Sequence, residues 1–114
     1  MDRARAAGSA ELSWSENPRE AVSGAHAVYT DTWISMGQEK EARSKRALFA
    51  GHRVDAELMA QAREDAVFLH CLPAHRGDEV TDEVMDSPAS LIFVQAGNRL
   101  PTQQALLAKL LGLA

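Results

Sequence analysis

Short apolar runs alternate along the chain with segments whose apolar residues recur at helical spacing. The apolar runs are Leu12–Ser15, Ala27–Thr30, Ala66–Leu69 and Leu91–Val94. Short runs of this kind, bounded by polar or turn-forming residues, favour strands. Strands that alternate with helices are typical of βαβ units and a mainly parallel sheet. The pattern therefore predicts an α/β fold with about four strands.

Helices are expected between these runs, and some carry their own start and stop signals. Asn17 is the predicted N-cap of a helix with Pro18 at its first position, and Glu20 is placed to complete a capping box. Gly24 is placed to end this helix in a left-handed conformation. Further helices are predicted at Arg3–Ala7, Glu39–Arg46, from Asp55 onward, at Thr81–Met85 and at Thr102–Leu113, the last with a stripe of leucines. We expect an incomplete doubly wound, Rossmann-like sheet of three layers.

Composition excludes several classes of protein. With 114 residues, 46% hydrophobic and 25% charged, the chain is one globular domain or a piece of one. A net charge of −4 speaks against a nucleic-acid or anionic-membrane partner, which would need clustered Lys and Arg. No apolar run approaches the roughly 20 residues of a membrane span. Cys71 is the only cysteine, so no internal disulfide can form, and a cytoplasmic location is expected.

Polar clusters follow two of the predicted strands, where open α/β sheets bind their ligands. The first is Asp31–Glu39, after the Ala27 strand. Asp31 can bind an ammonium group, while Ser35 and the backbone N–H groups near Met36 can bind the rest of an amino acid. An Asp at a strand end is also often only a loop anchor, so spacing alone leaves both interpretations open.

The second cluster is His70–Glu79, after the Phe68 strand. Cys71 can be a nucleophile, a ligand contact or a buried structural thiol, and its spacing does not decide among the three. A zinc site is not expected, because His70 and Cys71 point to opposite faces of a strand and no second cysteine exists. The bond between Leu72 and Pro73 is a candidate cis peptide.

A third polar element, Gln95–Leu100, follows the last predicted strand. Arg99 in this element can donate two hydrogen bonds to an anion or a carbonyl oxygen, or can be a surface ion-pair residue. A dinucleotide-binding enzyme is a distant alternative, because no G-x-G-x-x-G follows any strand.

In this order and spacing, the segments resemble the signatures of ornithine carbamoyltransferases, within the aspartate/ornithine carbamoyltransferase superfamily. Asp31–Glu39 (DTWISMGQE) is similar to the family's ornithine loop, and His70–Gly77 (HCLPAHRG) is similar to its second signature. The resemblance runs from about Gly8 nearly to the last residue. It implies that residues 1–114 are part of the second, ornithine-binding domain. The carbamoyl-phosphate-binding domain, with its Ser-Thr-Arg-Thr loop, has no counterpart in the sequence.

The resemblance also implies a reaction and a role for each matching residue. The side-chain amine of ornithine attacks carbamoyl phosphate, giving citrulline and phosphate, in arginine biosynthesis, the urea cycle or the arginine deiminase route, without metal or organic cofactor. Asp31 and Ser35 would hold the α-amino group of ornithine, and the backbone at Met36 its carboxylate. Cys71 and Leu72 would line the reacting centre, and Arg99 would bind the carbamoyl oxygen. The family forms trimers with sites between subunits.

Two departures from the family pattern affect Arg99: Gly97 replaces the usual Glu, and Pro101 replaces the usual His. The Ser-Met-Gly and His-Cys-Leu-Pro runs favour ornithine over aspartate as the acceptor, with putrescine or acetylated ornithine as lesser alternatives. Two functions remain open: a carbamoyltransferase whose 114 residues are inactive alone, and a non-catalytic module that binds an amino acid or associates with other subunits.

Overall fold

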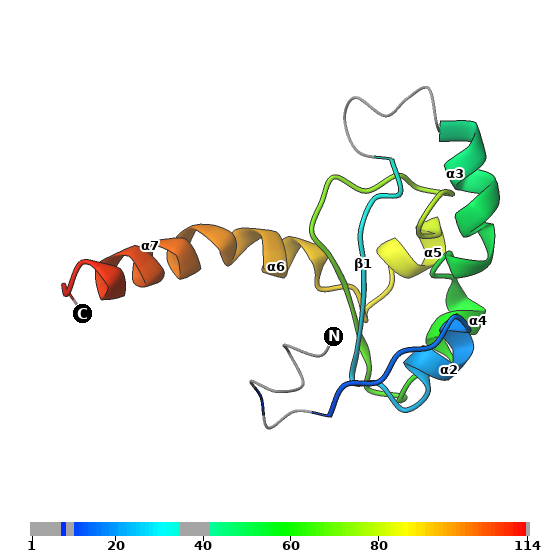
Figure 1. Ribbon diagram of the computed structural model, residues 1–114, viewed down its shortest axis with the longest axis horizontal. Coiled ribbons are helices and arrows are strands. Elements are labelled where there is room, and N and C mark those ends of the chain that lie inside the picture. Colours follow the sequence, from blue (N-terminus) through cyan, green and yellow to red (C-terminus); the bar gives the residue numbers. More distant parts are fainter. Residues whose placement is uncertain (1–7, 9–10, 35–41, 114) are drawn as a thin grey trace.

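The computed structural model describes residue 8 and residues 11–34 and 42–113 (Figure 1). Its elements, in chain order, are α2 (Pro18–Val22), β1 (Ala27–Thr30), α3 (Ala42–Phe49), the 3₁₀ turn η2 (Ala50–His52), α4 (Ala56–Met59), β2 (Val67–His70), α5 (Asp82–Met85), α6 (Ile92–Gly97) and α7 (Arg99–Leu110). Mixed helices and strands confirm the predicted α/β class. The predicted helix at Arg3–Ala7 lies outside the described residues.

The two strands form a parallel pair, in which Ala27 lies opposite Val67 and Thr30 lies opposite His70. On the other side of β2 the chain returns for a single parallel bridge between Phe68 and Ser90. The Phe68 N–H donates to the Ala89 carbonyl, and the Leu91 N–H donates to the Phe68 carbonyl. Because both strands are parallel and in register, their carboxyl ends meet at one edge.

The prediction of about four strands was wrong for the described residues, which form a two-stranded sheet. Two segments that were predicted as strands have other structures. Leu12–Ser15 is irregular, and Ser15 there accepts the Asn17 N–H and so forms part of the approach to α2. Leu91–Val94 turns into α6 directly after the Ser90 bridge. A run of four apolar residues fits either a strand or a buried helical turn, and periodicity cannot separate them. In α6 only Ile92 is buried, while Phe93 and Val94 are exposed.

The predicted helix starts at Asn17 and Asp55 are confirmed. The Asn17 side chain accepts the Arg19 N–H, and the Asp55 carboxylate accepts the Leu58 N–H, so each cap satisfies a free donor of its first turn. Gly24 has φ +70° directly after α2, a conformation that costs a glycine little. These caps hold short helices in place against the sheet.

The core lies on one face of the sheet. It is made of apolar side chains from both strands and from the segments that cover that face: Val28, Val54, Leu58, Phe68, Val80, Val84, Met85 and Ile92. Figure 1 shows α2, α4 and α5 together on one side of β1, whereas α6 and α7 run away from the sheet on the other. Tyr29, whose side chain points to the opposite face from Val28, is exposed. Among the described residues, the core thus covers one face of the sheet, while the face with Tyr29 is largely open.

Helices α6 and α7 follow one another almost in line and project from the body of the molecule (Figure 1). The break between them falls at Asn98. Pro101 accounts for it, because a proline has no N–H to donate to the carbonyl of Gly97, four residues earlier. No residue of α7 is buried, and its four-leucine stripe (Leu106, Leu107, Leu110 and Leu111) is exposed.

Candidate functional site

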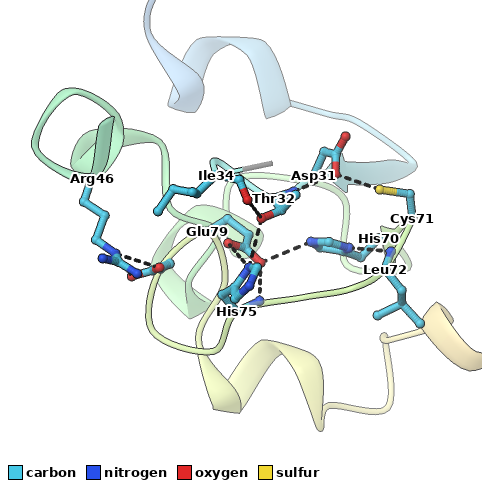
Figure 2. Close-up of polar contacts among 10 residues, drawn as sticks. Asp31, Thr32, Ile34, Arg46, His70, Cys71, Leu72, His75 and Glu79 are labelled. Carbon is cyan, nitrogen blue, oxygen red and sulfur yellow. Dashed lines mark hydrogen bonds and ion pairs between the residues drawn. The ribbon is translucent and has the colours of Figure 1, made fainter. Parts of the chain in front are cut away.

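Asp31 and Cys71 are neighbours at the carboxyl edge of the sheet, as the strand-end argument predicted. Thr30 lies opposite His70 in the register, so the next residue of each strand is Asp31 and Cys71. The Cys71 thiol donates to Oδ1 of Asp31 across 2.8 Å (Figure 2). The contact joins residues 40 positions apart and brings the two polar clusters together at one place.

Asp31 is an exposed carboxylate with one oxygen already occupied. Its Oδ1 accepts both the Cys71 thiol and the Thr32 N–H, the latter at 2.6 Å. These two donors, the thiol first, lower the pKa of Asp31 below its ordinary value. Among the described residues, none donates to Oδ2, which points away from Cys71 in Figure 2. An ionised carboxylate with a free oxygen is suited to bind an ammonium group.

Cys71 is half-buried and held as a thiol. Burial, and then the hydrogen bond to Asp31, raise its pKa above the ordinary value. A thiol is a far weaker nucleophile than a thiolate, and reactive cysteines usually lie beside positive charge. Of the three roles that the sequence left open, this environment suits a ligand contact better than a nucleophile.

Leu72 follows in an unusual backbone conformation. Its bond to Pro73 is cis, as the sequence suggested, and its own φ is +58°. A non-glycine residue in the left-handed region costs about 1–2 kcal/mol. The Leu72 N–H donates to Nδ1 of His70 across 2.8 Å, which helps to hold this conformation.

Behind this edge lies a buried polar group that the sequence did not reveal. His70 and Glu79 are almost completely buried, and the His70 Nε2 lies 3.3 Å from Oε1 of Glu79. The same Oε1 accepts the backbone N–H of His75. On the surface, His75 Nδ1 lies 2.9 Å from the Thr32 hydroxyl (Figure 2). Glu79 belonged to the predicted second cluster, but no pattern in the sequence indicated that its carboxylate would be buried.

Contacts with α3 hold the two loops from the side. The ring of Trp33 packs against Phe49 with centroids 5.9 Å apart. Arg46 donates to both carboxylate oxygens of Asp78, at 2.8 and 2.9 Å. Ser35 and Met36, the other predicted ligands of an amino acid, lie outside the described residues.

Arg99 lies apart from the Asp31–Cys71 pair. As the first residue of α7 it lines an open pocket of about 460 Å³ beside β2, together with Leu69, Val94 and Gln95. Within the described part of the chain it makes no hydrogen bond or ion pair. Gln95 connects this pocket to the site, because its side-chain oxygen accepts the His70 N–H at 3.0 Å. The sequence also did not indicate this role of Gln95.

The described residues contain no group of three His, Cys, Asp or Glu side chains arranged to hold a metal ion. None of their helices combines the length and apolar character needed to cross a membrane.

Comparison with known proteins gives a consistent result. Residues 1–110 match the family described as aspartate/ornithine carbamoyltransferase, Asp/Orn binding domain. The chain is 57% identical over 98 residues to an ornithine carbamoyltransferase of Prochlorococcus marinus, covering 86% of this chain and 31% of that protein. It is 49% identical over 112 residues to a chloroplastic ornithine carbamoyltransferase of Pisum sativum, covering 98% of this chain and 30% of the relative.

The fold agrees with these similarities. The anabolic ornithine carbamoyltransferase of Campylobacter jejuni superposes with a TM-score of 0.81 at 42% identity, over 88% of this chain and 33% of that one. The chain thus spans about a third of the length of the proteins it matches.

Proposed function

Because the chain belongs to the aspartate/ornithine carbamoyltransferase family, through that family's Asp/Orn-binding domain, we propose that it supplies the amino-acid half of an ornithine carbamoyltransferase. The observation that carries the proposal is the Asp31–Cys71 pair at the sheet edge, with Oδ2 of Asp31 free of donors among the described residues. Residues 1–114 are then part of the second domain, and carbamoyl phosphate binds mainly to the portion of the relatives that this chain does not span.

The proposed reaction forms one bond and breaks another. The uncharged side-chain amine of ornithine attacks the carbamoyl carbon, the bond from that carbon to the phosphate oxygen breaks, and the amine loses a proton as citrulline forms. Asp31 and Ser35 hold the α-ammonium group, and the backbone at Met36 binds the carboxylate. Cys71 and Leu72 line the reacting centre, and Arg99 binds the carbamoyl oxygen.

Cys71 contacts the substrate in this scheme but forms no bond to it, because the amine is itself the nucleophile. The raised pKa of the thiol agrees with this role. Cys71→Ser should therefore retain measurable turnover in a complete enzyme. Mass spectrometry during turnover should find no carbamoyl group on Cys71, and a carbamoylated Cys71 would contradict the scheme.

The 114-residue chain should not catalyse the reaction alone. Phosphate carries negative charge as it leaves, and several convergent donors must stabilise it. Most arginines in the described ranges already serve carboxylates: Arg19 with Glu57, Arg46 with Asp78, Arg63 with Asp65, and Arg76 with Asp82 and Asp86. Arg43, Arg53 and Arg99 have no carboxylate partner among the described residues, but of these three only Arg99 lines the pocket beside β2. A single arginine at the pocket cannot hold a leaving phosphate and orient two substrates.

A homotrimer with sites between subunits, a cytoplasmic location and a role in arginine metabolism complete the proposal. Support for the trimer and the metabolic role comes from the family resemblance. The location rests on the lone free cysteine, which suits a reducing compartment.

Citrulline formation tests the proposal. The purified chain is assayed with ornithine and carbamoyl phosphate, beside a chimera in which it replaces the matching third of the Prochlorococcus marinus relative. We expect no product from the chain and turnover from the chimera. Citrulline made by the chain, free of host enzyme, would overturn its expected inactivity. A folded chimera that binds ornithine without turnover would favour a non-catalytic module.

A further inference from the structure

Glu79 is an acidic side chain with no exposure, and it and His70 are the buried polar residues beside the apolar core. Burying a carboxylate costs several kcal/mol unless donors compensate it. Its Oε1 accepts the His75 N–H and lies 3.3 Å from His70 Nε2, which is within ion-pair distance although His70 Nε2 has no hydrogen-bond partner. Its Oε2 has no hydrogen-bond partner and lies 3.8 Å from His75 Nδ1. The buried Glu79 carboxylate thus contacts two histidines near the candidate site, His70 and His75.

The contact between Glu79 and His70 bears on which ring nitrogen of His70 carries the proton. Nδ1 of His70 accepts the Leu72 N–H, so in a neutral ring the proton must be on Nε2. Nε2 faces Oε1 of Glu79, which is the group that favours a proton there. Glu79 therefore selects the one neutral tautomer that can hold Leu72 in its left-handed conformation next to Cys71.

The contact between Glu79 and His75 connects Glu79 to the loop that follows β1. Glu79 holds the backbone of His75, and the His75 ring meets the Thr32 hydroxyl at 2.9 Å. The Thr32 N–H in turn donates to Oδ1 of Asp31. One buried carboxylate therefore reaches both loops of the candidate site, as Figure 2 shows.

We infer that Glu79 is a positioning residue that sets the relative placement of Asp31 and Cys71, acting through His70 on one loop and through His75 on the other. The inference about geometry stands without any substrate; its meaning for carbamoyl transfer rests on the proposed function. Glu79 touches neither Asp31 nor Cys71, and its effect on them is indirect.

The single cysteine makes the placement measurable, because a disulfide reagent such as dithionitrobenzoate can react only at Cys71. Glu79→Leu leaves the His75 N–H without its acceptor and removes the carboxylate that faces His70 Nε2. We expect Cys71 in this variant to react about tenfold faster, because a loop that has lost contacts holding it in place opens more often. Glu79→Gln keeps an oxygen in place of Oε1 and should stay within about twofold of the original rate.

Val84→Ala is the matched control, because Val84 is a core residue in α5 with 3% exposure and no part in the polar contacts. It should lower the melting temperature yet leave the rate at Cys71 within about twofold. An equal acceleration in Val84→Ala and Glu79→Leu would overturn the inference, because general loosening would then explain both. An unchanged rate in folded Glu79→Leu would overturn it as well.

A second measurement needs no variant and covers the case in which Glu79→Leu does not fold. Long-range ¹⁵N–¹H spectra of the unaltered chain report the tautomer of each of its four histidines. We expect His70 to carry its proton on Nε2. A proton on Nδ1 would exclude the bond from Leu72 and overturn the inference. Neither measurement involves ornithine or carbamoyl phosphate, so failure of the proposed function would leave both results unaffected.

Discussion

At the scale of single residues, the site depends on how the two oxygens of Asp31 are used. Oδ1 is occupied by Cys71 and Thr32, which fixes the carboxylate in the loop and keeps it ionised. Among the described residues, none donates to Oδ2, so this oxygen is available to a ligand. In the proposed site, Oδ1 would thus orient the carboxylate and Oδ2 would bind the ligand.

Asp31→Asn should weaken ornithine binding more than folding. The substitution removes the charge that would attract the α-ammonium group, a loss of about 1–3 kcal/mol for a charge-assisted hydrogen bond. Steady-state kinetics of the chimera should show a KM for ornithine raised about tenfold or more, with little change in melting temperature. Asp65→Asn, at an exposed carboxylate paired with Arg63, is the control. An unchanged KM in Asp31→Asn would remove Asp31 from the site.

The same substitution should make Cys71 more reactive at a fixed pH. Burial and Asp31 raise the pKa of the thiol, so a smaller fraction is thiolate at about pH 8 than for an ordinary cysteine. Removing the Asp31 charge moves the pKa back toward its ordinary value and increases that fraction. Alkylation by iodoacetamide, followed from about pH 7 to 10, should show its midpoint at lower pH in Asp31→Asn. A midpoint shifted upward would contradict the assigned cause.

The candidate positions Asp31 and Cys71 and the cis Leu72–Pro73 bond could be predicted from the sequence, because strand ends and turn residues leave local signals. The contacts of Glu79 and Gln95 could not be predicted. Their importance arises from contacts with residues 9 and 25 positions away, His70 in both cases, which depend on the packed fold. A glutamate in a polar segment gives no sign that its carboxylate will be buried.

At the scale of elements, capped helices were predictable and the last apolar run was not. Asn17 and Asp55 predict helix starts, because their side chains accept hydrogen bonds from N–H groups of the first helical turn. Leu91–Val94 has no such signal, and its state is decided by the Ser90 bridge and the turn that follows it. The two helices after that bridge differ in their contact with the core: α6 buries Ile92, and α7 buries nothing.

A matched pair of substitutions tests that difference. Ile92→Ala should lower the free energy of unfolding by about 2–5 kcal/mol, because it leaves a cavity beside Phe68 in the core cluster. Leu107→Ser, at a side chain that is 58% exposed, should change it by no more than about 0.5 kcal/mol. Urea unfolding of dilute protein, followed by circular dichroism, gives both values. A large effect at Leu107 would mean that α7 is packed against something in solution.

At the scale of the whole molecule, the chain is extended for its size. Its radius of gyration is 16.5 Å, against about 13 Å for a compact chain of this length. The projecting α7 contributes to this extension (Figure 1). Parallel sheets are normally covered on both faces, so this architecture is that of a part which fits against more protein. The relatives that the chain matches are about three times as long.

The isolated chain should therefore self-associate. Exposed leucines on α7 and the uncovered face of the sheet offer apolar surface that water disfavours. Sedimentation at increasing concentration should show species heavier than the 12.4 kDa monomer. Replacing Leu106 and Leu110 with Glu should reduce them, whereas the same change at Gln103 and Gln104 should not. A monomer at every concentration would contradict this prediction.

The contact between Gln95 and His70 gives α6 a mechanical role. Gln95 is fixed to the helix at one end and to the backbone of β2 at the other. Its neighbour α7 continues α6 outward by 12 residues, about 18 Å of helix. A displacement of α6 would therefore move a side chain that is hydrogen-bonded to His70, the residue that directly precedes Cys71. The same helix that anchors the projecting α7 thus also anchors the backbone beside the candidate site.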